Sequence, residues 1–114
     1  MHDTFASWLE NAAACPAVLA CGVRADANSV AVKTTQAEIP EGRVIEVING
    51  LADTARVLKQ NHIACDWFCW SLRIGQVYCA IRPDETMAVL LAGFDPGAVP
   101  DLERVLGEFL HAEM

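Results

Sequence analysis

The segment from Pro40 to His62 constrains the fold more than any other part of the chain, because it is the longest stretch with helical periodicity. Placed about 100° apart around a helix, its apolar residues fill an arc of roughly 160°, wider than the ~100° stripe of a helix on one surface. The arc contains Val44, Ile45, Val47, Ile48, Leu51, Ala52, Ala55 and Leu58. Such a helix needs two apolar neighbours. We expect its own sheet to be one and a second copy of the chain to be the other.

The opposite side of this helix is polar and includes Glu46, Asn49, Asp53 and Arg56. We expect this edge to stay in water and to form a rim that meets a protein partner. Gly50 lies near the middle of the helix, where glycine costs about 1 kcal/mol relative to alanine. Either another backbone approaches Gly50 closely, or it is a neutral surface glycine.

Further helices and strands are predicted on both sides of this segment. Apolar residues at helical spacing predict a first helix before Pro16 and a last helix from Pro100 onward. Apolar runs and alternating patterns predict five strands, at residues 16–25, 29–35, 65–73, 76–82 and 86–94. The chain of 114 residues is long enough for one core. We therefore expect a single α+β domain over residues 1–114, in the order helix, two strands, helix, three strands, helix.

The stretch from Cys65 to Arg82 is unusual, because it holds three of the five cysteines and two of the three tryptophans. Ile74-Gly75 separates two runs rich in aromatic and β-branched residues, which predicts a hairpin with a two-residue turn. The predicted register pairs Leu72 with Val77, Trp70 with Cys79 and Phe68 with Ile81 on one apolar face, and Ser71 with Tyr78, Cys69 with Ala80 and Trp67 with Arg82 on the other.

This register bears on whether the cysteines form a metal or thiol centre. Cys65 and Cys69 would lie ~13 Å apart along one strand, too far for two Zn–S bonds of about 2.3 Å to one ion. The spacing His62-x2-Cys65-x3-Cys69 contains no CxxC, and Cys79 would face the other side of the sheet. We interpret the thiols as reduced structural groups and expect no metal or cofactor. The sequence also lacks a P-loop, a dinucleotide fingerprint and a G-x-S-x-G motif, so we expect no catalysis.

The charge of the chain limits its partners. Fifteen acidic and eight basic residues give a formal charge of −7, which would repel nucleic acids and anionic membrane surfaces. The N-terminal sequence does not resemble a signal peptide, and no apolar run approaches the ~20 residues that span a bilayer. We expect a cytoplasmic protein. Because 54% of the residues are hydrophobic, part of the surface is expected to meet a partner.

The order of elements at this length resembles the roadblock/dynein light-chain family of small homodimerising domains. The resemblance covers nearly the whole chain and rests on VLACGVRADANSVAVKTT as a first hairpin, the long helix after EIPEG, the strand entry RIGQVYCAIR, and TMAVLLAGFDPGAVPDLERVL as last strand and closing helix. It implies a five-stranded antiparallel sheet of profilin-like architecture, with the long helix on one face and the terminal helices on the other. The density of tryptophan and cysteine between Cys65 and Trp70 departs from the family pattern.

The resemblance also implies how the chain assembles. Dimers of the family join through the long helix and the strand after it, here residues 44–58 and 65–72. Together with the wide apolar arc, this predicts a dimer interface of Val44, Val47, Ile48, Leu51, Ala55, Leu58, Trp67 and Cys69. The family further implies a non-catalytic regulator or scaffold for a small Ras-like GTPase or a related signalling complex.

Two other functions remain open at this level. A secretion-chaperone-like binder would hold an unfolded effector on exposed apolar strips, and three strands before its second long helix would favour it. A PAS-like domain would hold a small molecule between sheet and helix, near Trp67 or Trp70. An enzyme is the least favoured alternative, because the sequence offers no convergent polar groups.

Overall fold

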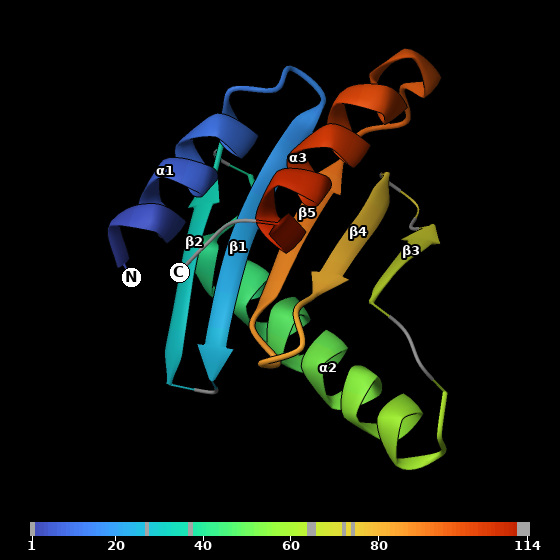
Figure 1. The fold of residues 1–114 in the computed structure, drawn as a ribbon. Coiled ribbons are helices and arrows are strands. Elements are labelled where there is room, and N and C mark those ends of the chain that lie inside the picture. The colour runs from blue at the N-terminus through green and yellow to red at the C-terminus, as the bar shows by residue number, and fades with distance from the viewer. Residues whose placement is uncertain are drawn as a thin grey trace.

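The computed structural model of this chain describes residues 2–26, 28–36, 38–63, 66–71, 73 and 75–111. In this part of the chain, five strands form one antiparallel sheet in the order β2-β1-β5-β4-β3 (Figure 1). The elements are α1 (His2–Ala13), β1 (Val18–Asp26), β2 (Ser29–Thr34), α2 (Glu41–Gln60), β3 (Trp67–Ser71), β4 (Gln76–Ile81), β5 (Met87–Ala92), a short 3-10 helix (Pro96–Ala98) and α3 (Val99–His111). This confirms the predicted α+β fold and the predicted order of elements.

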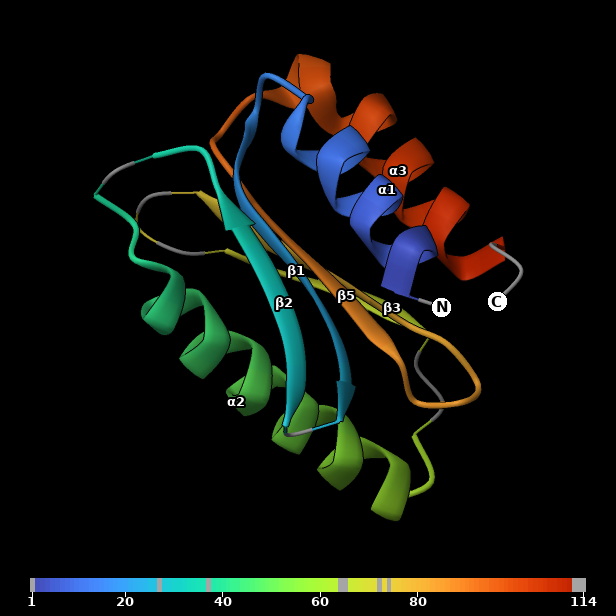
Figure 2. The same ribbon diagram turned by 90° about the vertical axis from the view of Figure 1, so that its left-hand side faces the viewer.

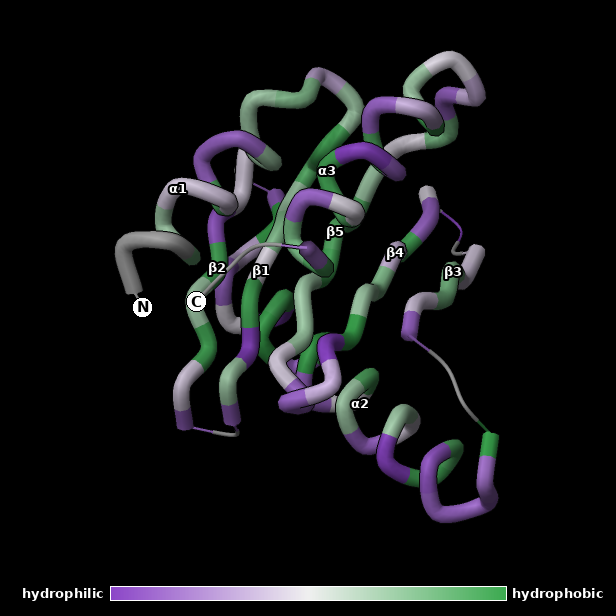
Figure 3. Tube along the Cα trace, in the orientation of Figure 1, coloured by the Kyte–Doolittle hydropathy of each residue, from purple (hydrophilic) through white to green (hydrophobic). Residues whose placement is uncertain are grey.

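Helices lie on both faces of the sheet. Figure 2 shows α2 on one face and the terminal helices α1 and α3 together on the other. Apolar residues concentrate in the central strands, whereas the last turns of α2 are mostly hydrophilic (Figure 3). Strand β5 is buried along almost its whole length, as expected for an apolar strand that is covered on both faces. The sheet therefore separates two apolar cores.

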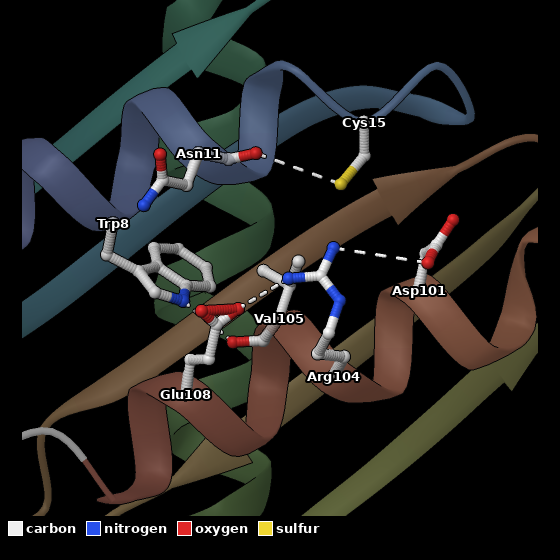
Figure 4. A network of polar contacts seen from close by, with 7 residues as sticks. All are labelled: Trp8, Asn11, Cys15, Asp101, Arg104, Val105 and Glu108. Atoms are coloured by element: carbon white, nitrogen blue, oxygen red, sulfur yellow. Dashed lines mark hydrogen bonds and ion pairs between the residues drawn. The ribbon is translucent and has the colours of Figure 1, made fainter.

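The core under α1 and α3 is closed by aromatic packing. The ring of Phe109 lies 6.4 Å from that of Phe5 and 5.5 Å from that of Trp8, measured between centroids. The indole Nε1 of Trp8 donates a hydrogen bond of 2.8 Å to the carbonyl oxygen of Val105, which joins α1 to α3 (Figure 4). The buried indole N–H therefore has an acceptor, so the core can hold Trp8 with its hydrogen-bond donor satisfied.

The core under α2 depends on a glycine in β1. A Cβ on Gly22 would overlap Cδ1 of Ile48, which is fully buried, and would lie 3.0 Å from Cγ1 of Val32. Gly22 thus allows α2 to approach the sheet closely. Gly50 has no atom within 4 Å of the position where its Cβ would be, so of the two interpretations the neutral surface glycine fits. The glycine required for close approach lies in the strand and not in the helix.

The hairpin between β3 and β4 differs from the predicted register. Trp70 pairs with Val77 and Phe68 with Cys79, so the pairing is shifted by two residues relative to the sequence-based one. The predicted two-residue turn is wrong: Ser71 pairs with Gln76, and Gly75 lacks the positive φ that such a turn requires of its glycine. Because the shift is an even number of residues, every described side chain of β3 and β4 keeps its predicted face. Leu72, which the predicted register paired with Val77, lies outside the described residues.

Candidate interaction surfaces

The position of α2 leaves part of its sheet face uncovered. The helix lies mainly across β1 and β2, where the Nε of Arg24 donates a hydrogen bond of 2.9 Å to Oδ1 of Asn49. Strands β4 and β3 lie on the far side of β5. Phe68 and Trp70 of β3 lie on the face of the sheet that α2 covers, with their rings 5.8 Å apart. Phe68 is half-buried, and Trp70 is 47% exposed. An apolar surface therefore continues from α2 to the edge of the sheet.

The wide apolar arc of α2 is only partly used by its own chain. Val44, Ile48 and Leu51 are buried in the core under the helix, and Ala55 and Leu58 are half-buried. Val47 is 46% exposed. Since two residues turn a helix by about 200°, Val47 lies on the flank opposite Asn49 and away from Arg24. Of the predicted interface residues on this helix, Val47, Ala55 and Leu58 are thus the ones with surface left to offer.

Strand β3 lies at one edge of the sheet, and β2 lies at the other. The amide of Ile81 donates a hydrogen bond of 2.7 Å to the carbonyl oxygen of Asp66, which fixes which residues of β3 bond to β4. Antiparallel ladders alternate, so Phe68 and Trp70 turn their backbone groups toward β4. The N–H and C=O groups of Cys69 and Ser71 then point to the outer edge. An edge strand with outward-directed backbone groups is a template for another strand.

The predicted interface residues of β3 lie on the face away from α2. Trp67 pairs with Ala80 and Cys69 with Tyr78, and both Ala80 and Tyr78 belong to the core under α1 and α3. Both β3 residues are exposed. The predicted set is therefore divided between the two faces of the sheet. The exposed Trp70, on the α2 face, is absent from that set; its alternation with Phe68 was visible in the sequence, but its position at an uncovered edge was not.

The predicted polar rim lies on the outside of α2. Glu46 pairs with Arg43 at 3.5 Å, and Asp53 pairs with Arg56 at 3.3 Å. All four of these side chains are largely exposed, and such pairs contribute little to stability. Asn49 is half-buried and holds Arg24. The rim is thus available to a partner at its two ends and bound to the sheet in its middle.

An open groove of about 920 Å³ lies at the end of the sheet where the β4–β5 turn is found. It is lined by the C-terminal half of α2, Ile63 and Asp66 in the segment after α2, the end of β1, residues 81–83, 85 and 87, and the end of α3. Lys59 reaches across it from α2 to Glu85 in the turn, with 3.1 Å between Nζ and Oε1. Glu85 has a φ of 73°, a left-handed conformation that favours glycine. This groove could not be predicted from the sequence, because its walls come from elements that lie far apart along the chain.

Three of the described thiols, those of Cys15, Cys21 and Cys69, do not have the properties of reactive cysteines. Burial raises the pKa of Cys21 to about 11 and also raises the pKa values of Cys15 and Cys69. These thiols are therefore protonated near neutral pH, whereas a nucleophilic cysteine needs a lowered pKa. Within the described ranges, no group of three or more His, Cys, Asp and Glu side chains is arranged to hold a metal ion. Cys65, part of the candidate metal spacing, lies outside the described residues.

Scans of protein-family models, of curated proteins and of solved structures each returned no match to this chain. None of the helices in the described part of the chain is long and apolar enough to cross a membrane. A function for this chain is therefore inferred from its surfaces.

Proposed function

We propose that this chain is a non-catalytic, homodimeric protein-interaction module, in which the β3 strands of two copies pair to make one continuous sheet. The single observation that carries the proposal is the edge strand β3, which directs backbone groups outward and presents the exposed Trp70 on the α2 face. The roadblock-like order of elements supports the same assembly, because that family dimerises through the equivalent helix and strand.

A second copy suits this edge for reasons of symmetry. Closed dimers use the same patch on both chains, and antiparallel strands pair readily about a two-fold axis. Cys69 is the middle residue of β3, so an axis near Cys69 would let the outward groups of each strand bond to those of the other. The same rotation would bring a second Trp70 and a second α2 flank, with Val47, to the uncovered face.

Proline substitution can test the pairing without disturbing the subunit. Cys69→Pro removes an N–H that points to the outer edge, and proline is tolerated on edge strands in that orientation. The variant should remain folded and become monomeric, as measured by light scattering after size exclusion and by circular dichroism. Phe68→Pro is the matched control: it removes an N–H that points to β4 and should destabilise the fold itself. A folded Cys69→Pro variant that stays dimeric would refute pairing through β3.

We further propose that the dimer binds a small Ras-like GTPase or a related signalling protein through the rim of Glu46, Asn49, Asp53 and Arg56. The resemblance suggests the class of partner, and the exposed charges of the rim suggest the surface. The test is co-purification with the tagged chain, followed by a direct binding assay of any recovered P-loop protein in its GTP and GDP forms. Asp53→Arg should abolish recovery, while Arg104→Glu, on α3, should not. Loss with both variants, or recovery only of proteins without a P-loop, would count against this partner.

The order of elements favours this module over a secretion-chaperone-like binder. Such a chaperone would be favoured by three strands before the second long helix, whereas two strands, β1 and β2, precede α2 here.

A further inference from the structure

The groove at the end of the sheet has a charge unlike that of the rest of the chain. Of the eight Lys and Arg residues in the sequence, four line this groove: Arg24, Arg56, Lys59 and Arg82. Among the residues that the structure describes, His111 also lines the groove, together with three acidic side chains. The described lining residues therefore carry a formal charge of +1 with His111 neutral, inside a chain whose total is −7.

Two of these cations already bind carboxylates in the groove. Arg56 pairs with Asp53 at 3.3 Å, and Lys59 pairs with Glu85 at 3.1 Å. The four side chains are all about two-thirds exposed or more, so each pair can exchange one carboxylate for another at little cost. These ion pairs are the kind of contact that the groove would form with an acidic group of a partner.

The lining also includes apolar side chains. Ile81, which is half-buried, contributes from the sheet, Ala55 from α2, and Ile63, which is 52% exposed, from the segment after α2. An open site that combines aliphatic surface with Arg and Lys suits a chain segment in which acidic and aliphatic residues alternate. A small inorganic anion would leave this apolar surface uncovered.

We infer that this groove binds an acidic, amphipathic peptide segment of the partner protein. From the proposed function the inference takes only that the chain has a protein partner, and it places part of that contact at Arg56 and Lys59. The acidic remainder of the surface repels such a segment, which directs it to the groove. Selectivity thus results from attraction at one place and repulsion elsewhere.

Fluorescence anisotropy with two labelled peptides of equal length tests the inference. One peptide alternates Glu and Leu, and the other alternates Lys and Leu. The Glu-Leu peptide should bind the full chain at low salt, and added salt should weaken the binding. The double variant Arg56→Glu with Lys59→Glu should bind it at least roughly tenfold more weakly. Arg43→Glu is the matched control, because Arg43 is exposed on the same helix and outside the groove, and it should bind as the wild type does.

Three results would overturn the inference. They are failure of the Glu-Leu peptide to bind at low salt, equal binding of the Lys-Leu peptide, and equal losses in the Arg43 and groove variants. A change of self-association in the double variant would instead identify a second copy as the occupant. Repeating the titration with Cys69→Pro separates this inference from the dimer proposal: a folded monomer that binds the Glu-Leu peptide supports the groove whatever becomes of the dimer.

Discussion

The two sides of this sheet differ in how completely one chain can cover them. Under α1 and α3, aromatic side chains and a buried indole hydrogen bond close the core, and Phe109 is 1% exposed. At the other extreme, every residue of β3 except Phe68 is exposed, and Trp67 and Trp70 are each nearly half exposed. The first region is complete within one subunit, whereas the second has apolar surface and backbone groups left for another molecule. We therefore expect the α1 and α3 side to contribute most to stability, and β3 with α2 to offer the surface that the proposed interactions use.

Truncating an aromatic residue in each region should give the largest contrast. Phe109→Ala removes a ring packed against Phe5 and Trp8 and should cost about 3–5 kcal/mol of unfolding free energy. Trp70→Ala removes a larger side chain, but that side chain is 47% exposed, so in a monomer its cost should be no more than about 2 kcal/mol. Urea unfolding in the Cys69→Pro background measures both. Equal costs would show that the two regions do not differ in the proposed way.

Alkaline pH should weaken the closed region through Cys21. Burial raises the pKa of this thiol from 9.0 to about 11, so the folded state favours the protonated form. The stability that this provides is complete below pH 9 and should be lost as the pH rises toward 11, by roughly 2–3 kcal/mol. Unfolding of wild type and Cys21→Ala at several pH values measures it. The substitution should flatten this part of the profile, and an unchanged profile would contradict the assignment.

The packing of α2 against the sheet can be tested at Gly22. Gly22→Ala places a methyl group where Cδ1 of Ile48 lies, so we expect a loss of about 1–3 kcal/mol. Ile48→Val removes that Cδ1 and should relieve the overlap, so the double variant should be more stable than the sum of the two single losses predicts. Denaturant unfolding of the four proteins gives the coupling. Strict additivity would mean that the close approach of Gly22 and Ile48 does not limit the packing.

The sequence was sufficient for the features that depend on long periodic patterns. The order of helices and strands follows from these patterns, and α1 buries Phe5, Trp8, Leu9 and Ala12, the residues that recur at helical spacing. The faces of the described β3 and β4 side chains were also predicted correctly, although the register was wrong. Side chains alternate with a period of two along a strand, and the register was shifted by two residues. Such features are local, so no knowledge of neighbouring elements is needed to predict them.

Features that depend on strand order could not be predicted in this way. Sequence neighbours β3 and β4 pair, but β1 pairs with β5 across most of the chain, which leaves β3 at an edge. That order decides which part of the wide arc of α2 is covered and why Trp70 is exposed. It also brings Arg24, Lys59 and Glu85 to one groove, although they are far apart in the sequence. Gly22 carries no signal in its own neighbourhood, since its role depends on where α2 lies.

The smallest effect is expected at Gly50, and it can sharpen the boundary of the open region. The Cβ added by Gly50→Ala would meet no atom within 4 Å, so in the Cys69→Pro monomer the substitution should stabilise the fold by about 1 kcal/mol through helix propensity. In the wild-type background, where we propose a dimer, the outcome depends on whether the helix of the second copy reaches this side of α2. An equal gain there would place Gly50 outside the interface, whereas weaker self-association would place it inside. Destabilisation of the monomer would contradict the exposed position of Gly50 itself. Measuring stability in one background and the dimer dissociation constant in the other thus maps how far around α2 a second copy extends.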